Sequence, residues 1–179
     1  MNKLTKTTLA LILLGGTLHA AAQKDPDVGN VTMNPKKTLM ENIALSPIHQ
    51  KLEDNLNTTT IAATLSGTGG PYTVFAPTDD AFNKPAEAAL AKADNAALTR
   101  VLQYHVVQGK LTSKKLGKLT KKGKTATLKT LEGDNVTIRK SGNIYILTDA
   151  KGGTAVITTP DVKTRNGYFH VIDAVLLPS

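Results

Sequence analysis

Two neighbouring carboxylates are the first residues in the sequence whose types suggest chemistry. Asp79 and Asp80 follow a short apolar run, and a pair of carboxylates is a common device for general acid–base catalysis. Neighbouring residues on a helix point about 100° apart, so these two side chains cannot readily share a proton. We interpret them instead as charges at the start of a helix, where the helix dipole favours negative groups. Thr78, the residue before them, supplies the side-chain oxygen expected of an N-cap.

Two histidines in strand-like runs are the next candidates for chemistry. His105 and His170 have no cysteine or second histidine at a ligand spacing, and the chain contains no cysteine at all. We therefore predict that neither binds a metal and that the protein needs no cofactor. We expect both to be buried, hydrogen-bonded strand residues that order the core. The sequence also lacks a nucleophile elbow, so we predict that the protein is not an enzyme.

A glycine-rich segment, GTGG at residues 67–70, has the composition of a phosphate-binding loop. Such loops bind phosphate because a helix begins directly after them and points its free amides at the anion. Here Pro71 and a run of β-branched and aromatic residues follow instead. We interpret the segment as a turn that leads into a strand.

Lysine is concentrated between residues 110 and 129, where no acidic residue occurs. The composition predicts a loop with little apolar content. Two hypotheses remain open for it: a solvated, flexible face, or a surface that contacts a polyanion through point charges. A nucleic acid is not expected as the partner, because the segment lacks interleaved aromatic residues. The candidate binding residues are Lys114, Lys115, Lys118, Lys121, Lys122 and Lys124.

The first 22 residues are predicted to be a secretory signal peptide. Lys3 and Lys6 give it a positive start, an apolar run follows, and residues 20–22 are the small residues that a signal peptidase needs. Cleavage is expected between Ala22 and Gln23. The apolar run is too short to span a bilayer, so we predict a secreted or periplasmic protein with no transmembrane segment in its mature chain.

The remaining chain divides into a polar leader at residues 23–37 and one domain at residues 38–179. The leader shows no periodicity, so we expect it to be flexible. Within the domain, helical patterns start at Thr38 and Ser46, and a third helix is expected at 59–65. The order of helices first and strands last predicts an α+β fold with a largely antiparallel sheet. The expected strands are 72–76, 104–107, 126–130, 136–139, 144–147, 155–158 and 168–177.

Three separated motifs in this order and spacing resemble the signatures of the fasciclin domain. They are TVFAPTDDAF at 73–82, YHVV at 104–107 and NGYFHVIDAVLLP at 166–178. The resemblance covers residues 38–178 and implies a wedge of two β-sheets, with about seven mostly antiparallel strands and a cluster of helices packed against it. It also implies a non-enzymatic role in adhesion or extracellular binding. The motif residues expected to be structural are Thr78, Asp79, Phe82, Tyr104, His105, Asn166, Gly167 and His170.

The resemblance also points to two segments that have been tied to cell binding in animal members of the family. Tyr104-His105 is one of them, and we expect these residues to be structural here. Pro160-Asp161 matches part of an integrin-recognition loop, but Lys163 stands where that loop has an apolar residue. We interpret Pro160-Asp161 as a turn that leads into the last strand, while keeping both residues as candidates for binding.

The expected partner is an extracellular or cell-surface protein, or an anionic polysaccharide that the lysine-rich segment would contact. The sequence does not define the oligomeric state. An alternative function is that of a small-ligand carrier, which would use a groove between the helices and the sheets.

Overall fold

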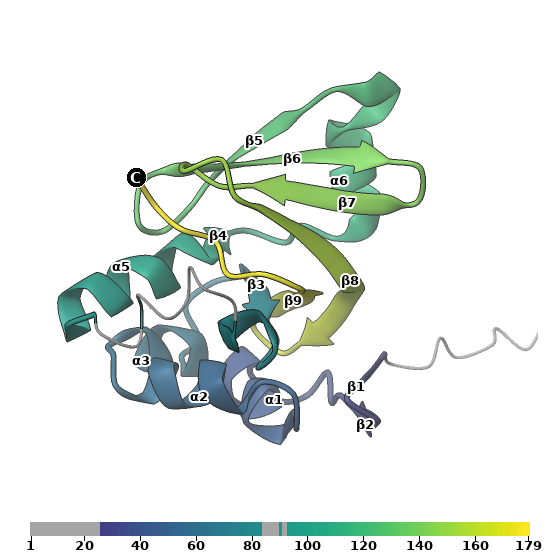
Figure 1. Cartoon of the computed structure of the whole chain (residues 1–179). Helices are drawn as coiled ribbons and strands as arrows, with labels where there is room; N and C mark the ends of the chain where they lie inside the picture. The colour runs from purple at the N-terminus through teal and green to yellow at the C-terminus, as the bar shows by residue number, and fades with distance from the viewer. Residues whose placement is uncertain (1–25, 84–89, 91–92) are drawn as a thin grey trace, which may run out of the picture.

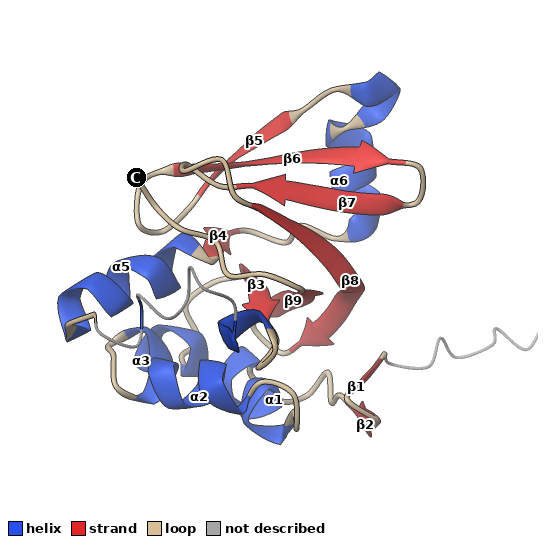
Figure 2. Ribbon diagram, in the orientation of Figure 1, coloured by secondary structure: helices blue, strands red, loops and turns tan. Residues whose placement is uncertain are grey.

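The computed structural model describes residues 26–83, 90 and 93–179 (Figure 1). The predicted signal peptide at 1–22 and its cleavage site at Ala22/Gln23 lie outside these residues. Helices dominate the first part of the described chain and strands the last part, which is the order that the sequence predicts (Figure 2).

A cluster of short helices lies at one end of the molecule (Figure 1). Its first helix starts after Thr38 because a capping box satisfies the free amides there: the Thr38 side chain accepts from Glu41 N, and Glu41 accepts from Thr38 N. The predicted helix start at Ser46 is wrong, because Ser46 ends the first helix and its hydroxyl bonds the His49 ring. The three helices are α1 (Leu39–Leu45), α2 (Gln50–Asn57) and α3 (Ile61–Ser66).

Within residues 78–83 the structure has a 3-10 turn, where the sequence predicts the start of a helix. Thr78 Oγ1 accepts from Ala81 N at 3.3 Å and so caps this turn. Asp79 acts on a different helix, because its Oδ1 accepts from Lys51 N at 2.8 Å in the first turn of α2. Phe82 is half-buried and packs against the hydrophobic core that lies between the helix cluster and the sheet, called here the helix-side core. The later helical elements are η1 (Ala81–Asn83), α5 (Asn95–Tyr104), α6 (Ser113–Leu119) and η3 (Lys121–Gly123).

A seven-stranded sheet runs in the order β4-β3-β9-β8-β7-β6-β5. Every neighbouring pair in it is antiparallel except β3 and β9, which are parallel. These pairings confirm the predicted α+β fold with about seven mostly antiparallel strands. The strands are β3 (Tyr72–Pro77), β4 (Val106–Gln108), β5 (Ala126–Lys129), β6 (Asn135–Ser141), β7 (Ile144–Thr148), β8 (Thr154–Thr164) and β9 (Gly167–Ile172).

Strand β8 joins the two halves of the sheet and gives it the shape of a wedge (Figure 1). Its first residues pair with β7, and the residues from Ile157 onward pair with β9. The register with β9 shifts on both sides of Thr159, which bends the strand. At the outer edges of the sheet, β4 and β5 meet through an isolated bridge between Val107 and Thr130.

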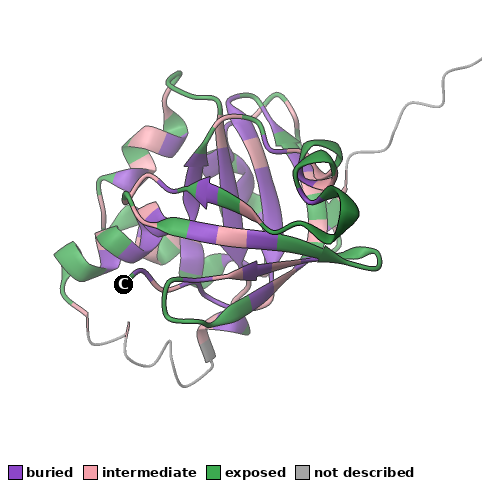
Figure 3. Ribbon diagram, turned by 90° about the horizontal axis from the view of Figure 1, so that it is seen from above, coloured by how far each residue is buried: buried purple, intermediate pink, exposed green. Residues whose placement is uncertain are grey.

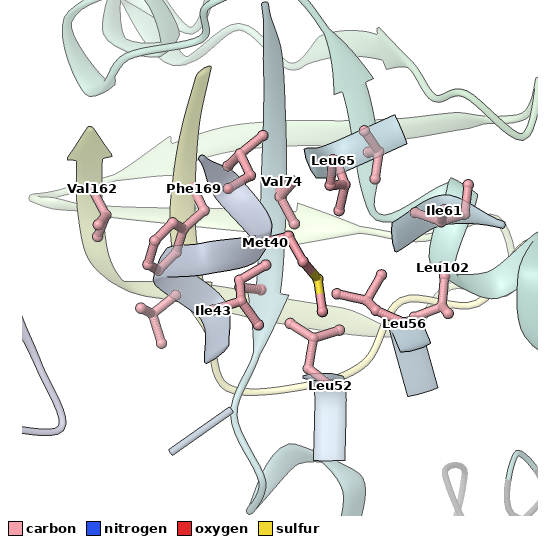
Figure 4. Packing of buried hydrophobic residues seen from close by; sticks show 14 of the residues in the cluster. Met40, Ile43, Leu52, Leu56, Ile61, Leu65, Val74, Leu102, Val162 and Phe169 are labelled. Carbon is pink, nitrogen blue, oxygen red and sulfur yellow. The ribbon is translucent and has the colours of Figure 1, made fainter. Parts of the chain in front are cut away.

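Two hydrophobic cores lie on opposite faces of the β3–β9 pair, because alternate strand residues point to opposite sides. Val74 and Phe169 face the helices, where they pack with Ile43, Leu52 and Leu56 (Figure 4). The second core fills the inside of the wedge. The outer face of β6 and β7 carries the less buried residues, so burial alternates along these strands (Figure 3). The second core includes Phe75, Tyr104, Leu116, Ile138, Leu147 and Ile172.

Residues 26–34 differ from the flexible leader that the sequence predicts. Strands β1 (Asp27–Val28) and β2 (Val31–Thr32) form a small hairpin. Val28 and Met33 are both buried in the helix-side core. The polar composition of the segment concealed this contact, because few apolar side chains make it: Val28 and Met33 are buried, and Val31 is partly buried against the same core.

Candidate functional site

The lysine-rich segment is helical, so the prediction of a loop is wrong. Thr112 caps α6 by accepting from Lys115 N at 3.3 Å. Leu116 lies on the inner side of the helix, where it is fully buried in the wedge core, and Leu111 enters the same core just before the helix. Two buried leucines are therefore enough to dock a segment whose other residues are mostly polar or charged.

The six candidate lysines of this segment are all exposed. In the part of the chain that the structure describes, none of them forms an ion pair with a carboxylate. Lys140 extends the same side of the molecule: its Nζ lies 5.6 Å from the centre of the Tyr145 ring, and Tyr145 Oη donates to Ser113 O at 2.8 Å. We use the name basic surface for Lys114, Lys115, Lys118, Lys121, Lys122, Lys124 and Lys140.

Asp161 holds the first turn of the lysine-bearing helix. Its Oδ1 accepts from Ser113 N at 2.6 Å, and its Oδ2 accepts from Ser113 Oγ. The predicted turn at Pro160-Asp161 is wrong, because both residues lie within β8 at its bulge, where Asp161 adopts a φ of +63°. The two candidate binding regions are thus in direct contact, and the Asp161 carboxylate is engaged within the protein.

His170 supports Asp161 from inside the wedge. Its Nδ1 accepts from Asp161 N at 3.1 Å, and its Nε2 lies 2.6 Å from the carbonyl oxygen of Leu111. These partners require the proton on Nε2 and a lone pair on Nδ1. The buried ring stacks on Phe75, with 5.8 Å between the ring centres. Burial lowers the pKa of His170, so the ring is neutral at pH 7.

Tyr104 and His105 close helix α5, so the predicted strand position of His105 is wrong. His105 Nδ1 lies 2.8 Å from Val101 O, and its Nε2 accepts from Leu176 N at 2.9 Å. Tyr104 Oη donates to Asn135 O at 2.7 Å. Burial lowers the pKa of His105 to about 4 and raises the pKa of Tyr104 to about 12. Both side chains are buried, so neither is placed to contact a partner.

A third buried histidine, His49, is absent from the sequence-based candidates. Its Nδ1 lies 2.7 Å from Ser46 Oγ, and its Nε2 lies 3.3 Å from Ala76 O. Burial lowers the pKa of His49 to about 4. Its spacing from Leu52 and Leu56 would have revealed it, because residues three and seven positions apart share a helix face.

Asn166 and Gly167 tie the helix cluster to the sheet. Asn166 Oδ1 accepts from Leu39 N at 2.8 Å, and its Nδ2 donates to Leu65 O at 2.8 Å. Gly167 lies beside Tyr72 in the parallel ladder, and a Cβ at this position would lie 1.9 Å from Tyr72 O. Only glycine fits there without a shift of the backbone.

The described surface also has hollows away from these residues. One of about 470 Å³ lies where the edges of β4 and β5 diverge, and Lys129 is among its lining residues. Another, of about 350 Å³, lies beside the glycine-rich loop and is lined by Lys110 and Arg165. A third, of about 220 Å³, lies between α5 and the C-terminal residues. Lys110 and Lys129, which are close in sequence to the lysine-bearing helix, therefore line separate hollows.

The described residues contain no cluster of metal ligands. Among residues 26–83, 90 and 93–179, no group of three or more His, Asp or Glu side chains is placed to hold a metal ion. Over the same ranges, no helix has the length and apolar character needed to cross a membrane.

The bent sheet, the helix cluster and the buried motif residues together form an α+β domain with a wedge-shaped sheet. The Fasciclin domain model matches residues 48–178, and the chain belongs to this family. Members of this family are non-enzymatic, which agrees with the prediction that the protein is not an enzyme.

Similar proteins occur among mycobacterial proteins and in an insect adhesion molecule. The chain is 31% identical to the immunogenic protein MPB70 of Mycobacterium bovis, over 78% of this chain and 72% of MPB70. It is also 31% identical to the cell surface glycolipoprotein MPB83 of Mycobacterium bovis, over 91% of this chain and 64% of MPB83. The fold matches a FAS1 domain pair from the insect cell adhesion molecule Fasciclin I, with a TM-score of 0.69 and 24% identity. That match covers 80% of this chain and 51% of the pair, so the chain spans about half of the solved structure.

Proposed function

We propose that the protein is an exported adhesion module whose basic surface binds anionic polymers of a cell surface or extracellular matrix. The observation that carries the proposal is the exposure of the six lysines in and after α6. None of them has a carboxylate partner among the described residues. The cell-surface relative MPB83 supports a location outside the cytoplasm.

A polymer is the partner that this arrangement favours, because each exposed charge contributes little alone. An exposed ion pair stabilises by about 0.2–1 kcal/mol, and salt screens it over about 8 Å under physiological conditions. A polymer with closely spaced charges meets several lysines at once, so these small contributions combine. The docking of α6 by Leu116 also lowers the ordering cost of binding, since the helix is folded before a partner arrives.

A salt series on immobilised polymers tests the proposal. Binding of the native domain to heparin-like and alginate-like polymers would be measured from about 0.01 M to about 1 M salt. A triple variant, Lys118→Gln with Lys121→Gln and Lys124→Gln, removes three charges from the basic surface. Three contacts of about 0.5 kcal/mol each predict an affinity loss of about tenfold at low salt. The loss should shrink as salt rises, because screening weakens the contacts that the native domain retains.

The matched control removes three exposed lysines elsewhere, with Lys36→Gln, Lys151→Gln and Lys163→Gln in one chain. Both variants have the same net charge, so a difference between them isolates the basic surface. Equal affinity in the two variants would contradict the proposal. Asp161→Ala is unsuitable as a control, because Asp161 holds the first turn of α6 and its loss would disturb the surface under test.

A small-ligand carrier that uses a groove between the helices and the sheets receives less support from the described hollows. The hollow with a helix on one side, between α5 and the C-terminal residues, has about 220 Å³. Small-molecule sites usually have about 300–1,000 Å³, so this space is small for a carrier.

A further inference from the structure

The hollow beside the glycine-rich loop gathers positive groups from segments far apart in the sequence. Lys110 comes from the segment after β4, and Arg165 comes from the turn between β8 and β9. Residues 67–70 form a third wall, and the hollow has about 350 Å³. Of the described residues that line it, none is acidic.

The two cations at this hollow have no direct contact with a carboxylate within the described chain. Neither the Lys110 ammonium nor the Arg165 guanidinium forms an ion pair there. Arg165 affects Glu41 at longer range: the pKa of Glu41 is lowered chiefly by hydrogen bonds from Thr38 and only to a smaller extent by Arg165. The backbone amides of residues 68–70 likewise donate no hydrogen bond to the described protein.

The glycine-rich wall is fixed from beneath. Asn166, which is buried, donates from Nδ2 to Gly67 O at 3.0 Å. Gly70 has a φ of +123°, and a Cβ at this position would lie 3.0 Å from Asn166 O. Gly109 N donates to Pro71 O at 2.7 Å, which joins the segment after β4 to the same wall. The hollow is therefore formed before any ligand binds, and this lowers the cost of ordering it.

The chemistry of these groups favours one oxyanion. A guanidinium offers two parallel N–H donors that match a carboxylate or sulfate, and an ammonium adds a point charge. Free backbone amides in a glycine-rich loop add further donors for an anion. The loop needs no helix after it for this purpose, because the positive charge comes from Lys110 and Arg165.

The geometry points to a site for a single carboxylate or sulfate group carried by a sugar unit of an anionic polysaccharide. The volume of about 350 Å³ lies at the lower end of the range for small-ligand sites, which fits one or two sugar units. This site goes beyond the basic surface, since different residues form it. It would select an individual anionic group, whereas the basic surface responds to charge density along a polymer.

An NMR titration of the ¹⁵N-labelled protein tests the site. The probes are a uronate disaccharide, a sulfated disaccharide and inorganic sulfate, each at constant ionic strength. We expect saturable shifts at the amides of residues 68–70 with at least one disaccharide. Arg165→Gln should weaken that binding by about tenfold or more, because it removes a charge-assisted pair of hydrogen bonds. Lys110→Gln provides a second variant, and the triple lysine variant of the basic surface should bind the disaccharide as the native protein does.

The outcomes separate the possible sources of the anion. Binding of the uronate assigns the site to a carboxylate, and binding of the sulfated sugar assigns it to a sulfate. Binding of inorganic sulfate without either disaccharide would overturn the assignment to a sugar unit. Unsaturable shifts, or native affinity in both Arg165→Gln and Lys110→Gln, would overturn the site itself. A loss caused by the triple lysine variant alone would place the disaccharide on the basic surface and likewise overturn this site.

Discussion

Acid should destabilise this protein before its carboxylates titrate, because its buried histidines must gain protons on unfolding. Burial lowers the pKa of His49 and of His105 from 6.5 to about 4, against smaller opposing effects of their hydrogen bonds and of nearby aspartates. The pKa of His170 is lowered for the same reason. All three rings lie in the protein interior as neutral groups with specific partners.

The sign and size of the effect follow from these values. The folded pKa lies below the unfolded value, so the unfolded chain binds more protons between pH 6.5 and about pH 4. Stability is therefore complete above pH 6.5, falls as the pH falls, and reaches its lower limit near pH 4. One pKa unit is worth about 1.4 kcal/mol, so His49 and His105 each remove about 3 kcal/mol over this window. A domain has about 5–15 kcal/mol in total, so the two together remove a large part of it.

Urea unfolding followed by circular dichroism, at pH values from about 7.5 down to about 4.5, measures this loss. Glu41 and Asp134 also have lowered pKa values, through hydrogen bonds from Thr38 and Ser179, but their effect starts below their ordinary values of 4.5 and 3.8. The matched variant is His105→Gln, which should be less stable at pH 7 but should lose about 3 kcal/mol less on acidification. A free energy of unfolding that stays constant from pH 7 to pH 4.5 would refute the reasoning. If the free energy of unfolding of His105→Gln falls with pH as steeply as that of the native protein, His105 does not contribute to the acid effect.

Two further predictions follow from single contacts, and a third follows from the N-terminal sequence. Asp161→Ala should lower the free energy of unfolding by about 2–4 kcal/mol, because it leaves two donors of Ser113 without an acceptor. Hydrogen exchange should show that the loss of amide protection is concentrated in α6. A loss of protection spread evenly over the domain would contradict the contact between Asp161 and Ser113. Gly167→Ala should prevent stable folding or lower the free energy of unfolding by more than about 4 kcal/mol, because its Cβ would overlap Tyr72 O. A native melting temperature in this variant would show that β3 and β9 can move apart there. The native exported protein should begin near Gln23, as N-terminal sequencing would show, and recovery of full-length protein from the cytosol would disprove export.

Local physical chemistry in the sequence was enough to predict the segment around β3. Tyr72 begins a short apolar run, Pro77 ends it, and Thr78 supplies a cap, so strand, stop and cap follow from neighbouring residues. The helix expected after the cap is instead a 3-10 turn. The same reasoning misplaced His105, because the run from Tyr104 to Val107 is as compatible with the end of a helix as with a strand. The helix extends to Tyr104, whose ring is buried in the wedge core.

The contacts that shape the candidate site could not be predicted, because they join distant segments. Asp161 and Ser113 are 48 residues apart, and no local pattern indicates that a carboxylate in one strand will hold the first turn of a helix. The helix itself was missed because Leu116 is its one buried residue, too few to produce a helical period. The hollow at Arg165 likewise depends on three segments that the folded sheet brings together.

The position of strand β8 has a mechanical consequence for a protein that binds a polymer under tension. The strand belongs to both halves of the wedge, and Asp161 at its bulge accepts a hydrogen bond from Ser113 N in the first turn of α6, the helix that carries much of the basic surface. A polymer pulled away from α6 would therefore transmit its tension into a strand that pairs with β7 along its first residues and with β9 from Ile157 onward, and not only into a connecting loop. Widening the wedge would require that strand to straighten at the bulge, which would also shift Asp161 and the start of α6. Polymer binding by the basic surface and the angle between the two halves of the sheet are thus coupled through one strand.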